Sequence, residues 1–398
     1  MSTYSPAAWE RAMKLHEALV QTIAGKMTWL QAAEVVGVAP RTMRRWRVRM
    51  EQFGIEGLKD RRMLSPSGKA IKPPELARWL KLYRTRYRGY NARHFWSTCR
   101  REHGLTWSYT LIREALQAAG LIRRHRPRGR HFRRREPRGS FGEMLHLDGS
   151  RHRWLALRPH DYQSLIVVVD DATRRILYAQ LVDQECTRAV FDALGAVLTQ
   201  HGIPQVLYTD RASWAAVTLK AGAPVEKGRL TQVGLALKKL GVEHILAYTP
   251  QARGRSERTN RTLQGRLVNE LRAAHIRSVE AANRYLNEHF LPAYNQEFGR
   301  PPAEPTPAFV PLGTVSLQSI LCHEEERCVG RDNTVQLDGV RMQIDKQPSR
   351  ATCAGLTVTL RRHLDGTHAV LWGKRVLGRY DARGRRLQTA IVASEAAA

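Results

Sequence analysis

Apolar residues in the middle of the chain fall into short runs that alternate with stretches of helical spacing. The runs predict strands, and they cover residues 145–148, 164–169, 176–182, 205–209 and 242–247. The stretches with apolar residues three and four apart predict helices at 185–200, 230–240 and 252–274. Because three strands precede the first helix and strands then alternate with helices, we expect a mixed sheet flanked by helices.

The first 64 residues predict a helix-turn-helix domain. Thr28 and Gln31 form a capping box that starts a helix ending at Gly37, and Pro40 starts a second helix. Five arginines lie in the nine positions from 41 to 49. This pattern favours a recognition helix in a DNA major groove, although an ordinary helical hairpin with a solvated basic face would share it. The candidate DNA contacts are Arg41, Arg44 and Arg45.

Residues 75–122 predict a second helical unit, with helices near 75–86, 92–103 and 107–119. We interpret it as another helix-turn-helix domain, with or without a wing, and Arg113 as a candidate DNA contact. The alternative is a purely structural unit, because its aromatic residues suit a core equally well.

The C-terminal part begins with a proline-rich linker, residues 301–325. Short apolar runs then alternate around the Asp338-Gly339 and Asp365-Gly366 turns, which are strong hairpin signals. We predict a small SH3-like β-barrel over residues 326–385, serving as a DNA- or subunit-docking surface or as a structural module.

The distribution of charge indicates what kind of partner this multidomain chain binds. The 398 residues carry a formal net charge of +29, and residues 1–140 hold 31 Lys and Arg against 10 Asp and Glu. Such a basic half favours a nucleic acid, although ribosomal and membrane-surface proteins share the feature. The linker 123–140 is the most basic segment, and its candidate phosphate contacts are Arg123, Arg124, Arg128, Arg130, Arg133 and Arg134.

No membrane or secretion signal modifies this expectation. No apolar run reaches the roughly 18–20 residues of a membrane span. The five cysteines lack C-x-x-C spacing, which favours reduced thiols in a cytoplasmic protein over a zinc site.

Three carboxylates are placed where phosphoryl-transfer chemistry would need them. Asp148 and Asp210 each close a predicted strand, and Glu257 lies near the start of the predicted helix 252–274. Hard cations such as Mg²⁺ prefer oxygen ligands, and two such ions can hold the attacking and leaving oxygens of an in-line displacement. We therefore predict two Mg²⁺ ions, with Mn²⁺ as a substitute.

Other acidic residues have a simpler interpretation. Asp170 and Asp171 stand in a turn between two strands, where Asp commonly binds nearby backbone groups. Asp183 and Glu143 are expected to be structural or surface residues, and His146 is expected to be a packed histidine.

Four segments resemble ISNCY-type insertion-sequence transposases of the DDE superfamily, which includes retroviral integrases. They are LHLDGSRHRW (145–154), VVVDDATR (167–174), YTDRAS (208–213) and TPQARGRSERTNRTLQ (249–264). The resemblance implies an RNase H-like catalytic domain over residues 141–300, with Asp148, Asp210 and Glu257 as the metal ligands. Unlike many members of the superfamily, this chain has no glycine two residues after the second aspartate.

The implied activity is Mg²⁺-dependent cleavage at the 3′ ends of a transposon and strand transfer into target DNA. The partners would be double-stranded DNA and further copies of the chain, at least a dimer, in a bacterial cytoplasm near the nucleoid. Candidate DNA contacts beside the third carboxylate are Arg253, Arg255, Arg258, Asn260 and Arg261. Two alternatives are a catalytically inactive DNA-binding regulator derived from a transposase and an RNase H-like nuclease that cuts without joining.

Overall fold

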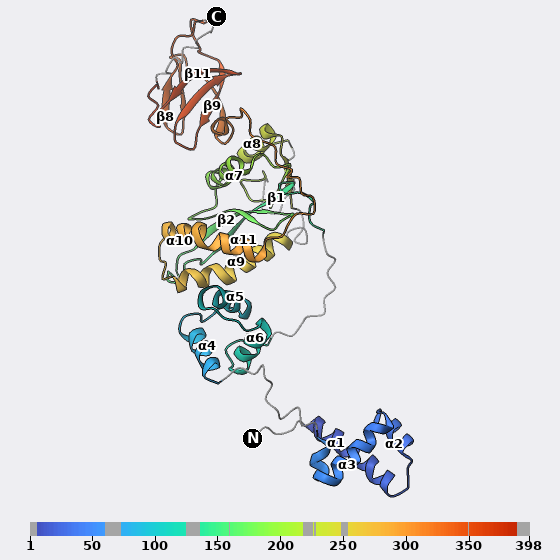
Figure 1. Ribbon diagram of the computed structural model, residues 1–398. Coiled ribbons are helices and arrows are strands. Elements are labelled where there is room, and N and C mark those ends of the chain that lie inside the picture. Colours follow the sequence, from blue (N-terminus) through green and yellow to red (C-terminus); the bar gives the residue numbers. More distant parts are fainter. Residues whose placement is uncertain are drawn as a thin grey trace, which may run out of the picture. The chain divides into compact units, whose positions relative to one another are not determined.

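The computed structural model describes residues 6–59, 73–124, 136–158, 160–217, 226, 228–247, 254–348 and 350–387. The chain forms two compact units, Met1–Trp79 and Leu80–Ala398 (Figure 1). No helix within these described ranges is long and apolar enough to cross a membrane.

The first unit contains the predicted helix-turn-helix. Its helices are α1 (Pro6–Ile23), α2 (Trp29–Val36) and α3 (Pro40–Phe53), and a 3₁₀ turn follows at Gly54–Leu58. Thr28 and Gln31 cap α2 reciprocally as predicted, and Gly37 ends it with a φ of 76° that favours glycine. Buried residues of α1, α2 and α3 form one core, which includes Leu19, Ala33 and Met43.

Three helices follow: α4 (Pro73–Thr85), α5 (Ala92–His103) and α6 (Tyr109–Ala118). Asn91 and Ser108 cap α5 and α6 through side-chain oxygens that accept backbone N–H groups. Residues 73–124, all of them described, contain no strand, so this unit has no wing.

A five-stranded mixed sheet forms the centre of the second unit. Its strands are β1 (Met144–His152), β2 (Gln163–Asp170), β3 (Ile176–Val182), β4 (Val206–Thr209) and β5 (Glu243–Leu246). They lie in the order β3-β2-β1-β4-β5, with β1, β2 and β3 antiparallel and with β4 and β5 parallel to β1. A mixed sheet is what the sequence predicts for this segment.

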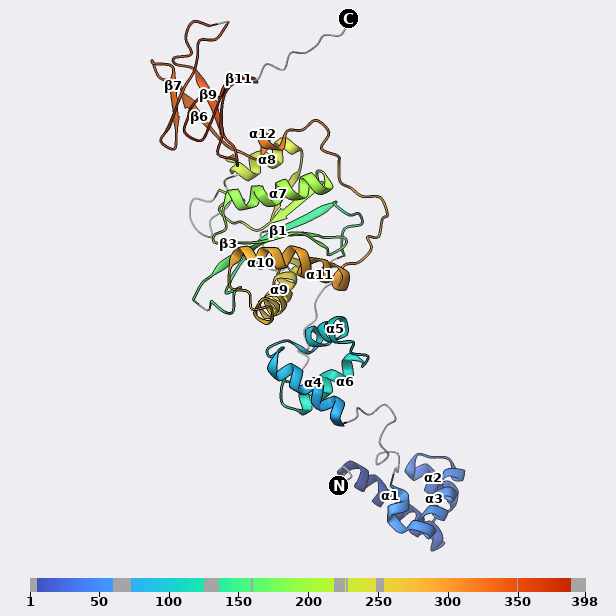
Figure 2. The same cartoon turned by 60° about the vertical axis from the view of Figure 1, so that its left-hand side comes forward.

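Helices cover both faces of this sheet (Figure 2). One face packs against α7 (Thr187–His201) and α8 (Gln232–Leu240), and the other against α9 (Gly254–Ala273), α10 (Val279–Tyr285) and α11 (Leu291–Phe298). Side chains alternate along β1, so Leu145 and Leu147 enter the α7 core. Asp148 therefore lies on the opposite face, towards α9.

Among the described residues the C-terminal strands form no closed barrel, so the small SH3-like barrel predicted from the sequence is not shown. After the short helix α12 (Leu317–Ile320) come β6 (His323–Cys328), β7 (Thr334–Leu337), β8 (Val340–Gln343), β9 (Thr357–Arg362), β10 (His368–Trp372) and β11 (Arg375–Tyr380). Within the described residues these make an open four-stranded sheet, β11-β10-β9-β6, and a separate β7-β8 hairpin. The two pack around a shared apolar core, so side chains join them in place of a continuous hydrogen-bonded ladder.

The Asp338-Gly339 hairpin itself is confirmed. Both residues have positive φ, 46° and 80°, as a two-residue turn joining twisted strands requires.

Candidate active site

Strand pairing brings Asp148 and Asp210 to neighbouring backbone positions. β1 and β4 are parallel, with Leu145 opposite Leu207 and His146 opposite Tyr208. The pairing ends there; continued by two residues, the same register would set Asp148 beside Asp210, just past the end of β4. Asp148 is 6% exposed, and Asp210 follows directly on the last residue of β4.

Helix α9 is bonded to the same part of β1. The Asn260 side-chain amide donates to Asp148 Oδ2 at 2.8 Å, and the Gln264 amide donates to Ser150 Oγ at 3.0 Å. From Asn260 to Gln264 the helix rises about 6 Å, and from Asp148 to Ser150 the strand rises about 6.6 Å. Because these two rises are similar, both hydrogen bonds can form together. Asn260 was predicted to touch DNA, and the structure gives its amide the carboxylate of Asp148 as a partner.

Glu257 is not gathered with the two aspartates. It lies in the first turn of α9, one turn before Asn260, and its side chain is exposed. Among the residues that the structure describes, no three His, Cys, Asp or Glu side chains are close enough together to hold a metal ion. The strand register thus relates the backbone positions of the first two predicted ligands, and the third lies on the helix that contacts Asp148.

A fourth carboxylate, Glu185, lies on the other face of β1. Its Oε1 accepts a hydrogen bond from Trp214 Nε1 at 2.5 Å, and a methyl group at Gly149 would overlap its carboxylate. Asp210 Oδ1 accepts from the Ala212 backbone N–H at 2.9 Å, which orders the start of the loop that leads to Trp214. The sequence analysis did not identify Glu185, because no motif relates it to Gly149 or Trp214.

The turn aspartates have the structural roles predicted for them. Asp170 is fully buried and accepts hydrogen bonds from Gly142 N, Thr173 N and Thr173 Oγ1 at 2.6–2.9 Å. Burial raises the pKa of Asp170, and these hydrogen bonds offset part of the effect. Asp171 Oδ1 lies 2.8 Å from Nε2 of His146, which is packed and 2% exposed.

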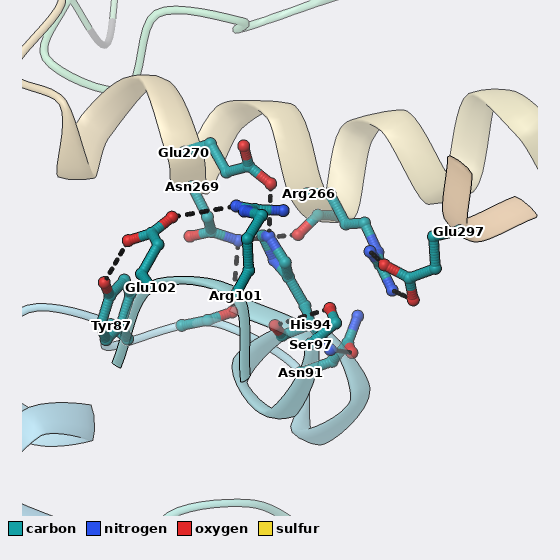
Figure 3. A network of polar contacts seen from close by, with 12 residues as sticks. Tyr87, Asn91, His94, Ser97, Arg101, Glu102, Arg266, Asn269, Glu270 and Glu297 are labelled. Atoms are coloured by element: carbon teal, nitrogen blue, oxygen red, sulfur yellow. Dashed lines mark hydrogen bonds and ion pairs between the residues drawn. The ribbon is translucent and has the colours of Figure 1, made fainter. Parts of the chain in front are cut away.

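The other end of α9 is joined to α5 by buried polar contacts (Figure 3). His94 Nε2 lies 2.7 Å from Glu270 Oε1, and Tyr285 OH donates to Glu270 Oε2 at 3.0 Å. Helix α9 is also bonded to α11, because Arg266 binds Glu297 through both terminal nitrogens at 2.7 and 2.9 Å. Burial lowers the pKa of His94, although its bond to Glu270 acts in the opposite direction. One helix thus contacts both the aspartate-bearing strand and the second helical unit.

The predicted DNA contacts are basic surface residues where the structure describes them. Those with exposed side chains are Arg41, Arg44, Arg45, Arg123, Arg124, Arg258 and Arg261. Arg113 is half-buried and lies 3.5 Å from Glu114. Five others lie outside the described residues or side chains: Arg128, Arg130, Arg133, Arg134 and Arg253. The same holds for the side chain of Arg255, whose backbone is in α9.

Comparison with known proteins gives a family. Residues 17–67 match the model of a helix-turn-helix domain. The protein y4bF of Sinorhizobium fredii, named as a transposase, is 32% identical over 365 residues, which cover 91% of this chain and 79% of y4bF. The transposase for insertion sequence IS1202 of Streptococcus pneumoniae is 28% identical over 69% of this chain and 66% of its own length.

Two solved structures are also similar. The catalytic core domain of HTLV-2 integrase, in complex with magnesium, is 16% identical with a TM-score of 0.28, over 38% of this chain and 91% of that chain. The simian T-cell lymphotropic virus intasome, in complex with the PP2A regulatory subunit B56 gamma, is 13% identical with a TM-score of 0.32, over 74% and 99%. On the extent of its match to y4bF, the chain belongs to the transposase family.

Proposed function

We propose that the chain is a DDE-type transposase of the ISNCY kind, which cleaves the 3′ ends of a transposon and joins them to target DNA. The observation that carries this proposal is the strand register that sets Asp148 beside Asp210, with Asn260 of α9 bonded to Asp148. Glu257, one turn before Asn260, is the third member of the site.

The residues suit a divalent cation. Two carboxylates about 4.8 Å apart would repel by roughly 3–4 kcal/mol at an effective dielectric near 20, and a cation between them would remove that cost. Asp148 and Asp210 would hold Mg²⁺, or Mn²⁺ in its place, and Glu257 would join them from the first turn of α9. When bound, the two ions lower the pKa of an attacking water or 3′-OH and stabilise the leaving oxygen.

The protein's own groups position this chemistry. The Asn260 amide fixes one oxygen of Asp148, so the carboxylate is oriented before any ligand arrives. The exposed arginines of α3 would dock the element ends, with Arg258 and Arg261 holding the strand near the site. Because two ends must be joined to one target, the active form is at least a dimer.

The test compares Asp148→Asn with Asp183→Asn, the same change at an exposed carboxylate beyond β3. The probes are labelled duplexes from both flanks of the coding region, incubated with a supercoiled target plasmid and Mg²⁺ or Mn²⁺. The wild type and Asp183→Asn should cut and join, and Asp148→Asn should lose about 1000-fold or more, since several kcal/mol of transition-state stabilisation go with a metal ligand. All three should shift the duplexes equally in gels.

Two outcomes would overturn the proposal. Specific retention of the duplexes without cutting in either metal would indicate a DNA-binding regulator. Cutting without any joined product would indicate a nuclease.

A further inference from the structure

Two arginines flank an exposed tyrosine at the loop end of the β1-β2 hairpin. The Cζ atoms of Arg151 and Arg153 lie 5.2 and 5.0 Å from the centroid of the Tyr162 ring. In the ladder His152 is opposite Gln163, so the register continued by one residue sets Arg153 across from Tyr162. Arg151 shares that side because side chains alternate along a strand. Tyr162 remains 47% exposed.

Among the described residues, no carboxylate is ion-paired with the two arginines of this cluster. Asp161, the acidic residue adjacent to Tyr162, forms its ion pair with Arg158. Two guanidinium groups repel each other, so in water they would move apart. Here both lie near the Tyr162 ring, and the cation–π contacts oppose that repulsion. The ring therefore holds two cations in a fixed geometry suited to a polyanion, and guanidinium groups match phosphate oxygens well.

The cluster lies beyond the candidate active site along β1, and its side chains leave the strand on the face opposite to Asp148. Arg151 is three residues past Asp148, about 10 Å along β1. Strand β1 extends beyond the last residue of β4. The cluster therefore lies at the end of the strands where the chain leaves β4 at Asp210.

We propose that Arg151, Arg153 and Tyr162 form a phosphate clamp on the DNA strand that is cut, away from the reacting bond and past the end of β4. The position relative to the reacting bond rests on the proposed function, and the DNA contact itself does not. Tyr162 is a positioning residue that keeps the two guanidinium groups on one side of the hairpin.

The test measures how affinity for the flanking duplex depends on salt, with the full chain. Arg151→Gln/Arg153→Gln should reduce the slope of log K against log salt by about 2, so its deficit relative to wild type shrinks about tenfold between 50 and 200 mM salt. Arg158→Gln, in the same loop but paired with Asp161, is the matched control and should leave the slope within about half a unit. Tyr162→Phe should keep the wild-type slope, and Tyr162→Ala should lower it.

A methylphosphonate moved along the cut strand locates the clamp. It should weaken wild-type binding at the clamped phosphates, away from the cleavage position, and leave the double variant unaffected there. An unchanged slope in the double variant, with circular dichroism showing a folded protein, overturns the clamp even if cutting is normal. If the wild type never cuts but the double variant still has a smaller slope than the wild type, the DNA contact is supported and only the proposed function is refuted.

Discussion

At the scale of single residues, Gly149 is the position whose missing side chain admits Glu185 beside the aspartate-bearing strand. An alanine there would overlap the Glu185 carboxylate, which would move and break the bond from Trp214. We expect Gly149→Ala to lower the free energy of unfolding by about 1–2 kcal/mol, measured by denaturant titration with tryptophan fluorescence.

The cause can be separated by a double-mutant cycle. Gly149→Ala should cost little when Glu185→Ala has already removed the carboxylate, so additive costs would contradict the steric account. Gly265→Ala in α9 is the matched control, because a methyl group there meets no atom within 4 Å. It should be neutral or stabilising by up to about 1 kcal/mol.

The sequence predicts a site residue when the pattern that places it lies within a few residues along the chain. Asp148 and Asp210 end apolar runs, and Asp170 binds Thr173 three residues away, so a local pattern reveals all three. The bond from Asn260 to Asp148 joins residues 112 apart, and it exists only because α9 lies along β1. Glu257 remains a prediction.

At the scale of elements, α9 links the aspartate-bearing strand to α5, and Glu270 is the centre of the second contact. Removing its carboxylate leaves the buried His94 Nε2 and the Tyr285 hydroxyl without their acceptor. Glu270→Ala should destabilise the α5–α9 contact by about 2–3 kcal/mol. Amide hydrogen exchange in α5 should accelerate about 30- to 100-fold, with α7 little changed.

Glu288→Ala is the control for this prediction, because Glu288 is an exposed glutamate in the neighbouring π-helical turn Leu286–Phe290. Amide hydrogen exchange in α5 of the Glu288→Ala protein should match that of the wild type. Equal protection of α5 in the Glu270→Ala protein would show that apolar packing alone holds the contact.

The spacing of apolar residues predicted most strands of the central sheet. It failed for β6, where charged residues stand in place of alternating apolar ones. β6 has the sequence HEEERC, which lacks apolar alternation. It forms a strand because Glu324 pairs with Arg361 across the sheet and with Lys239 of α8. Helix α1 does have apolar residues at helical spacing, Ala12, Leu15 and Leu19, and it was not assigned from the sequence. The open C-terminal sheet could not be predicted from hairpin signals, because closure depends on pairing between distant strands.

At the scale of the whole molecule, the first unit holds a core of its own. The buried apolar residues of α1, α2 and α3 contact one another, from Ala12 to Leu58. Domains of about 60 residues often fold alone, so we expect the fragment Met1–Trp79 to be helical and to unfold cooperatively in thermal circular dichroism.

The same fragment isolates the DNA contribution of α3. It should bind duplex DNA weakly and with strong salt dependence, because its exposed arginines displace counterions. Arg44→Gln/Arg45→Gln should reduce the slope of log K against log salt by about 2 without changing the melting temperature. Arg11→Gln, an exposed arginine on α1, should leave the slope unchanged. If all three fragments gave the same slope, α3 would not be the DNA-binding helix, and the basic face of this unit would be merely solvated.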